Sequence, residues 1–116
     1  MRDHRKLEVF QLADSLTLSI YAVTRRFPED ERYGLTSQLR RAAVSIGANI
    51  VEGCSRSTKP DYVRFLGLAY SSAREVEYEL SIARRLGYLD APAAEKVELL
   101  ALRTCRGLHG LIRALN

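Results

Sequence analysis

The sequence predicts an all-α protein in which one domain, residues 1–116, forms an antiparallel up-and-down four-helix bundle. Four segments repeat apolar residues three or four positions apart, which is the spacing of one helix face. Short connectors containing proline or glycine separate these segments, and short connectors favour antiparallel neighbours. No stretch shows the alternation of apolar and polar residues that is typical of a strand.

The first helix is predicted from about residue 5 to residue 27, where Pro28 ends the pattern because proline lacks an N–H group. Its core stripe comprises Val9, Leu12, Ala13, Leu16, Ile20, Val23 and Phe27. A second apolar stripe, roughly opposite, comprises Leu7, Phe10, Leu18 and Tyr21. The connector PEDERYG follows, with one predicted helical turn at residues 28–31.

The second helix, predicted over residues 35–55, is apolar on two faces. Its core stripe comprises Leu35, Leu39, Ala42, Ala43, Ile46, Ile50 and Gly53. Since a helix that is apolar on two faces is usually buried on both, we predict that the other face meets a second chain. The predicted interface comprises Phe10, Tyr21, Val44, Gly47, Ala48 and Val51.

Capping residues predict where the last two helices begin. Thr58 is a good N-cap for the third helix, and Asp61 is placed to return a bond to it. Gly87 is the predicted end of this helix, and Asp90 caps the fourth. The third stripe comprises Tyr62, Phe65, Leu66, Ala69, Ala73, Val76, Leu80 and Ala83. The fourth comprises Val97, Leu100, Ala101, Thr104, Leu108, Leu111 and Leu115, with Gly107 and Gly110 allowing a neighbour to approach.

Polar residues beside the core stripes are interpreted as a structural seam rather than a site. The seam comprises Arg41, Asn49, Glu52, Glu75 and Glu77. An amide at the edge of a core needs a partner, so Asn49 is expected to bond backbone or polar groups on a neighbouring helix. Glu75 and Glu79 lie one turn apart, but a di-iron bundle needs Glu-x-x-His motifs that this chain lacks. Ion pairs with Arg41, Arg84 or Arg85 are favoured over a metal.

The sequence offers no catalytic, cofactor-binding or metal-binding residues. His4 lies near the chain end and His109 stands alone, so neither shows metal-ligand spacing. Cys54 and Cys105 also lack a metal spacing, and a reduced pair is expected. The protein is therefore predicted to be non-enzymatic. The charged segment MRDHRKLE and the lack of an apolar run of about 20 residues favour a cytoplasmic protein outside the membrane.

A formal net charge of +4 permits an acidic partner without requiring one. Arg40, Arg56, Lys59 and Arg64 are the predicted contacts to RNA or DNA phosphates, which need Lys or Arg at no fixed spacing. Arg2, Arg5 and Lys6 form a further basic group. The alternative is that these charges serve solubility alone.

Three motifs occur in order along the chain: YGLTSQLRRAAVSIGANIVEG, DYVRFLGLAYSSAREVEYEL and RRLGYL. With them the chain resembles, over residues 27–89, the small four-helix bundle family found in intervening sequences of bacterial 23S ribosomal RNA genes. The resemblance implies a homopentamer and no enzymatic activity. Gly47 departs from the pattern, since many family members have proline there. The fold is also similar to that of accessory proteins of diversity-generating retroelements, which makes a reverse transcriptase a partner by analogy alone.

We therefore expect a self-associating bundle that binds nucleic acid without catalysing a reaction. A protein-interaction module with an incidental basic surface is the first alternative, and a metal enzyme in the bundle core is the second. Salt-dependent retention of polyanions distinguishes the binder from the interaction module. Bound metal or cofactor would indicate the enzyme.

Overall fold

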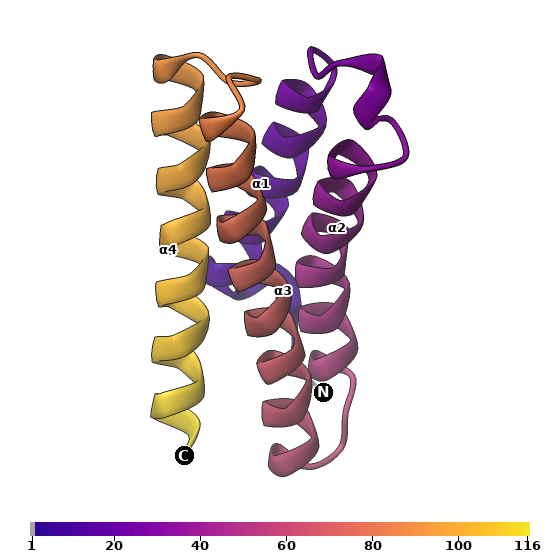
Figure 1. Cartoon of the computed structure of the whole chain (residues 1–116). Helices are drawn as coiled ribbons and strands as arrows, with labels where there is room; N and C mark the ends of the chain where they lie inside the picture. Colours follow the sequence, from indigo (N-terminus) through magenta and orange to yellow (C-terminus); the bar gives the residue numbers. More distant parts are fainter. Residues whose placement is uncertain (1) are drawn as a thin grey trace.

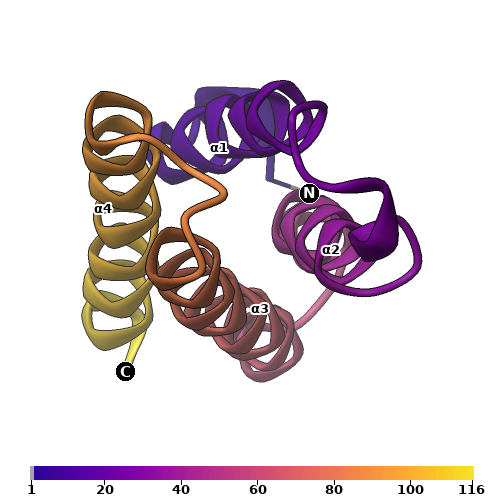
Figure 2. The ribbon, with the colours of Figure 1, turned by 45° about the horizontal axis from the view of Figure 1, so that its top comes forward.

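Four helices lie side by side in alternating directions in the computed structural model of the protein, which describes residues 2–116 (Figure 1). They are α1 (Glu8–Thr24), α2 (Leu35–Cys54), α3 (Lys59–Arg85) and α4 (Ala91–Leu115). Each helix packs on the two beside it, in the order α1, α2, α3, α4 and back to α1, as the tilted view shows (Figure 2). The predicted all-α class with four helices is confirmed, and the described residues contain no strand. The pentamer stays a prediction.

The first helix is shorter than predicted at both ends. A 3₁₀ turn, η1 (His4–Lys6), precedes it, because the Asp3 side chain accepts a hydrogen bond from the Arg5 backbone N–H. Leu7 then adopts an extended conformation and separates this turn from α1. At the other end the helix stops at Thr24, before Pro28, and Phe27 is buried outside the helix. The predicted turn in the next connector is confirmed as η2 (Glu29–Glu31).

Both predicted N-caps are confirmed. The Thr58 hydroxyl accepts from the Asp61 N–H at 3.2 Å, and the Asp90 carboxylate accepts from the Ala93 N–H at 2.9 Å. The expected return bond from Asp61 to the cap is not formed, because its carboxylate pairs with Arg64 instead. Gly87 ends the third helix with φ of +81°, a conformation that favours glycine.

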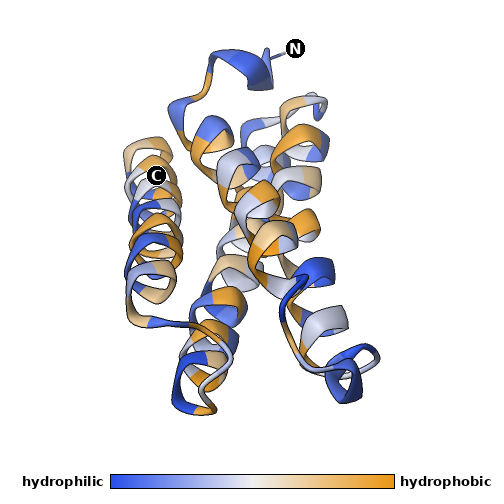
Figure 3. Cartoon of the chain, turned by 90° about the horizontal axis from the view of Figure 1, so that it is seen from above, coloured by the Kyte–Doolittle hydropathy of each residue, from blue (hydrophilic) through white to orange (hydrophobic). Residues whose placement is uncertain are grey.

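One hydrophobic core fills the space between the helices, and most of the predicted stripes line it. The hydropathy colouring shows apolar residues recurring along each helix, whereas the N-terminal turn is hydrophilic (Figure 3). Burying a large aliphatic side chain stabilises a fold by roughly 1.5–3 kcal/mol. The largest fully buried aliphatic side chains are Leu16, Ile20, Leu39, Ile46, Ile50, Leu66, Leu80 and Leu108. None of the helices described here is long and apolar enough to cross a membrane.

The two glycines of the fourth helix differ in their surroundings. A Cβ atom on Gly107 would lie 3.0 Å from Val9 Cγ2, so this glycine does allow α1 to approach α4 closely. A Cβ atom on Gly110 would have no neighbour within 4 Å. The predicted close approach is therefore confirmed at Gly107 and wrong at Gly110.

Candidate interaction surfaces

The second apolar stripes of α1 and α2 share one surface, which we call the outer α1–α2 face, except that Leu7 lies instead beside Gly107 and Leu111 of α4. Phe10 lies beside Gly47, since a Cβ atom on Gly47 would be 3.8 Å from Phe10 Cε1. In the single chain Tyr21 is 39% exposed, Val44 47% and Val51 38%. The outer α1–α2 face comprises Phe10, Leu18, Tyr21, Val44, Gly47, Ala48 and Val51. The fold thus leaves the predicted interface residues on the outside of the bundle, and their contact with another chain stays a prediction.

Arg40 lies at the edge of this face. Its Nε donates a 2.9 Å hydrogen bond to the Thr24 hydroxyl, and its guanidinium lies 4.8 Å from the centre of the Tyr21 ring. Arg56 follows Arg40 by sixteen residues and lies just past the C-cap Ser55 of the same helix, which corresponds to a helical rise of about 24 Å. The four predicted nucleic-acid-binding residues therefore do not form one patch, and Arg40 stands apart from the other three.

The other three residues lie where α2 connects to α3. The guanidinium groups of Arg56 and Arg64 lie 4.8 Å and 4.4 Å from the centre of the Phe65 ring. Asp61 lies between them, 3.0 Å from Arg64 Nε and 3.9 Å from Arg56 Nε. Arg56 also pairs with Glu52 one turn earlier. Both guanidinium groups are therefore held in place by carboxylates and by an aromatic ring.

The N-terminal segment adds a further cation to this region. The Arg2 guanidinium lies 4.0 Å from the centre of the Tyr62 ring, and the Arg2 N–H donates to Cys54 O at 3.1 Å. Lys59, the first residue of α3, is exposed. We call this region the basic connector end, and it comprises Arg2, Glu52, Arg56, Lys59, Asp61, Arg64 and Phe65. Four cations against two carboxylates leave it with a formal charge of +2.

The polar seam crosses from α2 to α3 through hydroxyl groups. Asn49 Nδ2 donates to Ser45 O at 2.9 Å and to Ser45 Oγ at 3.1 Å. The Ser45 hydroxyl in turn lies 2.9 Å from Ser72 Oγ. Both Asn49 contacts are on its own helix, because the amide folds back by one turn. The expected direct contact with a neighbouring helix is therefore replaced by one through Ser45.

The ion pairs of the seam differ in part from those predicted. Glu77 pairs with Arg74 at 3.1 Å, whereas Arg84 pairs with Glu98 of α4 at 2.8 Å. Glu52 pairs with Arg56. The side chains of Arg41 and Glu75 have no hydrogen bond or ion pair to any residue in 2–116, although both line one cavity of about 340 Å³.

Glu79 is the most unusual group in that cavity. Glu79 is only 8% exposed, and its Oε1 atom has no hydrogen-bond partner among the described residues. Burial, and secondly the charge of Glu75, raises the pKa of Glu79 to about 7. The cavity also contains Gln38, Arg41, Ser45 and Ser72. The sequence offered one signal for this burial: Glu79 lies three residues after Val76 and four before Ala83, within the core stripe.

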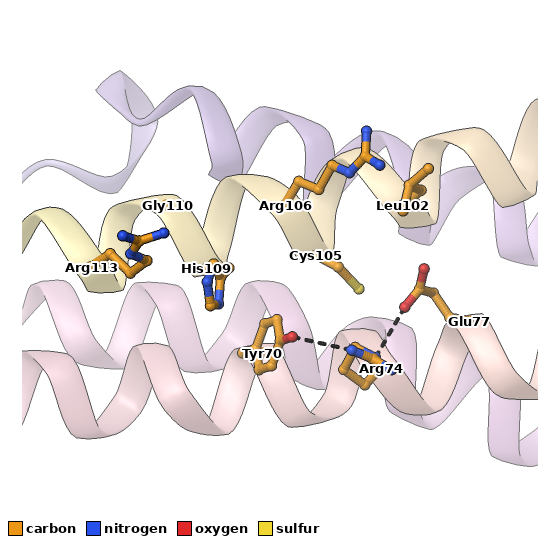
Figure 4. A pocket seen from close by; sticks show the side chains of 9 residues that line it. All are labelled: Tyr70, Arg74, Glu77, Leu102, Cys105, Arg106, His109, Gly110 and Arg113. Atoms are coloured by element: carbon orange, nitrogen blue, oxygen red, sulfur yellow. Dashed lines mark hydrogen bonds and ion pairs between the residues drawn. The ribbon is translucent and has the colours of Figure 1, made fainter.

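A second cavity, of about 500 Å³, opens between α3 and α4 (Figure 4). We call it the α3–α4 pocket, and its lining comprises Tyr70, Arg74, Glu77, Leu102, Cys105, Arg106, His109, Gly110 and Arg113. The Tyr70 and His109 rings are 5.9 Å apart, centre to centre. Sequence reasoning missed the three arginines as a group, although Arg106, His109 and Arg113 follow the i, i+3, i+7 spacing of one helix face. Arg74 comes from the other helix, so pairing it with them required the fold.

Both cysteine thiols are buried, and burial favours their protonated form. Burial is the main reason why the pKa of Cys54 is raised. Burial, and secondly a hydrogen bond to Glu77, raises the pKa of Cys105 to about 12. A thiol with a raised pKa is a poor nucleophile at neutral pH. No three His, Cys, Asp or Glu side chains among residues 2–116 are grouped to hold a metal ion.

Residues 5–110 match the model of the 23S rRNA-intervening sequence protein family. The chain belongs to this family. The match covers all four helices apart from the last residues of α4, and it confirms the family that the motifs between residues 27 and 89 indicated. Membership assigns no reaction to the chain.

A solved structure from the S23 ribosomal protein family of Bacteroides thetaiotaomicron VPI-5482, a protein described as having unknown function, is similar in fold to this family member. The TM-score is 0.83 at 24% sequence identity, and the match covers 90% of this chain and 97% of that one. At this identity the likeness shows the fold alone. Comparison with curated proteins finds no match.

Proposed function

We propose that this family member is a non-enzymatic, self-associating bundle that binds the phosphate backbone of RNA or DNA through its basic connector end. The observation that carries the proposal is the packing of two guanidinium groups, from Arg56 and Arg64, on the single ring of Phe65. Guanidinium groups bind phosphates, and together with aromatic rings they stack on unpaired bases. Arg2 on Tyr62 repeats the same chemistry beside them.

Self-association makes this weak surface useful. One basic connector end has a formal charge of only +2 and neutralises few phosphates. Several copies in one assembly present the same surface repeatedly, which raises the overall affinity without any new contact. The outer α1–α2 face supports a second copy of the chain as its occupant, because its exposed apolar residues come from two helices and lie together. A closed ring of five follows from the family resemblance and is part of the proposal.

Fluorescence anisotropy with labelled single-stranded RNA and DNA tests the proposal. Binding should be nearly independent of sequence and should weaken steeply between about 50 and 200 mM salt, because cations released from the phosphates drive it. The proposal would be rejected if the protein bound neither the labelled RNA nor the labelled DNA at the lowest salt concentration.

A protein-interaction module is the second candidate, and the outer α1–α2 face is the observation that favours it. In that case the exposed apolar residues bind a different protein, and the basic connector end serves solubility. The analogy to retroelement accessory proteins makes a reverse transcriptase one such partner. Defined self-assembly together with failure to bind polyanions at any salt concentration would favour this candidate.

A further inference from the structure

The arginines that line the α3–α4 pocket outnumber the carboxylates that could pair with them. The lining contains three guanidinium groups, from Arg74, Arg106 and Arg113, and one carboxylate, from Glu77, which gives a formal charge of +2 with His109 counted as neutral. Arg106 and Arg113 have no hydrogen bond or ion pair from their side chains to any residue in 2–116. Arg113 lies in the last turn of α4, where the helix dipole favours a cation. The dipole does not explain Arg106, two turns earlier.

Arg74 is held in a fixed position at the pocket wall. Its Nη1 donates to the Tyr70 hydroxyl at 3.2 Å, and its Nε lies 3.1 Å from Glu77 Oε1, as the dashed lines show (Figure 4). A guanidinium has five N–H donors, so these two contacts leave three for a ligand. The Cys105 thiol lies beside Glu77 and stays protonated, since its pKa is raised to about 12 mainly by burial. It therefore adds no negative charge to the pocket.

Two glycines keep this side of the bundle open. A Cβ atom on Gly110, which lines the pocket, or on Gly67 would meet no atom within 4 Å. Gly67 precedes Tyr70 and Arg74 at the i, i+3, i+7 spacing, so it lies on the same face of α3, about one turn before Tyr70. Each glycine costs its helix about 1 kcal/mol relative to alanine, and neither has the close contact that explains Gly107. A glycine at position 110 leaves open space in the pocket that a ligand can occupy, which would offset its cost to the helix.

We propose that the α3–α4 pocket binds a phosphate monoester. The formal charge of +2 matches the dianion of such a group, and guanidinium groups bind phosphate oxygens in pairs. Leu102 and the Tyr70 ring provide an apolar wall for the organic part of the ligand. The volume of about 500 Å³ lies within the range of small-molecule sites, roughly 300–1,000 Å³. This site goes beyond the proposed function, because it is built from α3 and α4 and shares no residue with the basic connector end.

Titration calorimetry of the full chain with phenyl phosphate tests the proposal, with phenol and diphenyl phosphate as the uncharged and singly charged comparisons. Phenyl phosphate should bind saturably, and both comparisons should bind at least about tenfold more weakly, because hydrogen bonds to charged groups are lost. Inorganic phosphate should compete. Absence of saturable binding, or equal binding of phenol, would overturn the proposal.

Two variants locate the site. Arg106→Gln should weaken phenyl phosphate binding at least about tenfold, whereas the control Arg25→Gln, an exposed arginine at the end of α1, should not. Gly110→Leu should fill the pocket and remove binding while raising the melting temperature, since it replaces a helix glycine, so unfolding cannot account for the loss. Binding that survives both substitutions would overturn the proposed site.

A competition experiment between phenyl phosphate and RNA that lacks terminal phosphates separates the pocket from the nucleic-acid surface. Such RNA presents only phosphodiesters, each with a single charge, so it should not displace phenyl phosphate from the pocket. Displacement by this RNA would overturn a monoester site and assign the pocket to the nucleic-acid surface. Conversely, Arg106→Gln should leave the salt dependence of RNA binding unchanged, so the two proposals can fail separately.

Discussion

Phe10 of α1 lies against Gly47 of α2, where an added Cβ atom would be 3.8 Å from the ring, an ordinary van der Waals distance. Gly47→Ala should therefore fit without strain and remove the cost of a helix glycine. We expect a gain of about 0.5–1 kcal/mol in the free energy of unfolding, measured by urea denaturation. A loss of stability would show that an added methyl group disturbs a close contact, either with Phe10 or with a second copy on the outer α1–α2 face.

Gly53, in the last turn of the same helix, gives the opposite prediction. A Cβ atom there would lie 2.9 Å from Phe65 Cβ and 3.3 Å from Tyr62 Cδ1, so the two helices would have to move apart. Gly53→Ala should lower the free energy of unfolding by about 1–3 kcal/mol despite its better helix propensity. Equal effects of the two substitutions would mean that helix propensity, rather than packing of α3 on α2, decides both.

Glu79 predicts how stability depends on pH. Burial and Glu75 raise its pKa from 4.5 to about 7 in the folded chain, so the native state binds this proton more tightly than the unfolded chain. Stability should therefore fall as pH rises from about 4.5 to about 7 and stay low above that. Glu79→Gln should stabilise the protein by roughly 1–3 kcal/mol at pH 8 and by little at pH 5, measured by urea denaturation.

The exposed Glu95 of α4 provides the control for that experiment. Glu95→Gln removes the same charge without changing a buried group, so its effect should be within about 0.5 kcal/mol at both pH values. A pH-independent effect of Glu79→Gln would contradict the raised pKa. Arg41 lines the same cavity, and a pairing of Arg41 with Glu79 in solution would produce that result.

Local chemistry accounts for what the sequence predicted well. The side chains of Thr58 and Asp90 each accept a hydrogen bond from the backbone N–H three residues later, so a few consecutive residues are enough to predict each cap. Leu7 was misassigned to a helix because the turn before it depends on one hydrogen bond between Asp3 and Arg5. The burial of Glu79 was missed although its position within the core stripe of α3 was a signal for it. The α3–α4 pocket was missed for a different reason. It depends on which residues of the two helices lie opposite one another, and a pattern along one helix carries no such information.

The outer α1–α2 face predicts an assembly that one charge should break. Val51→Asp would place an unpaired carboxylate in the proposed contact between copies, which is costly in an apolar interface. Light scattering at micromolar concentration should show an oligomer for the natural chain and a smaller species for this variant. Leu99→Asp, on an exposed part of α4, introduces the same charge and should leave the mass unchanged. A natural chain that is already monomeric would refute the assembly.

The basic connector end predicts a uniform loss of nucleic-acid affinity when its charges are removed. Changing Arg56 and Lys59 together to alanine should weaken binding to all sequences alike and reduce the slope of log affinity against log salt. The control removes Arg25 and Lys96, two exposed cations remote from this end, and should keep both affinity and slope. Because Arg56 pairs with Glu52, circular dichroism should first show that the helices are intact; an exposed pair contributes only about 0–1 kcal/mol. If both double variants lost affinity equally, net charge rather than this surface would govern binding, and the proposed site would be wrong.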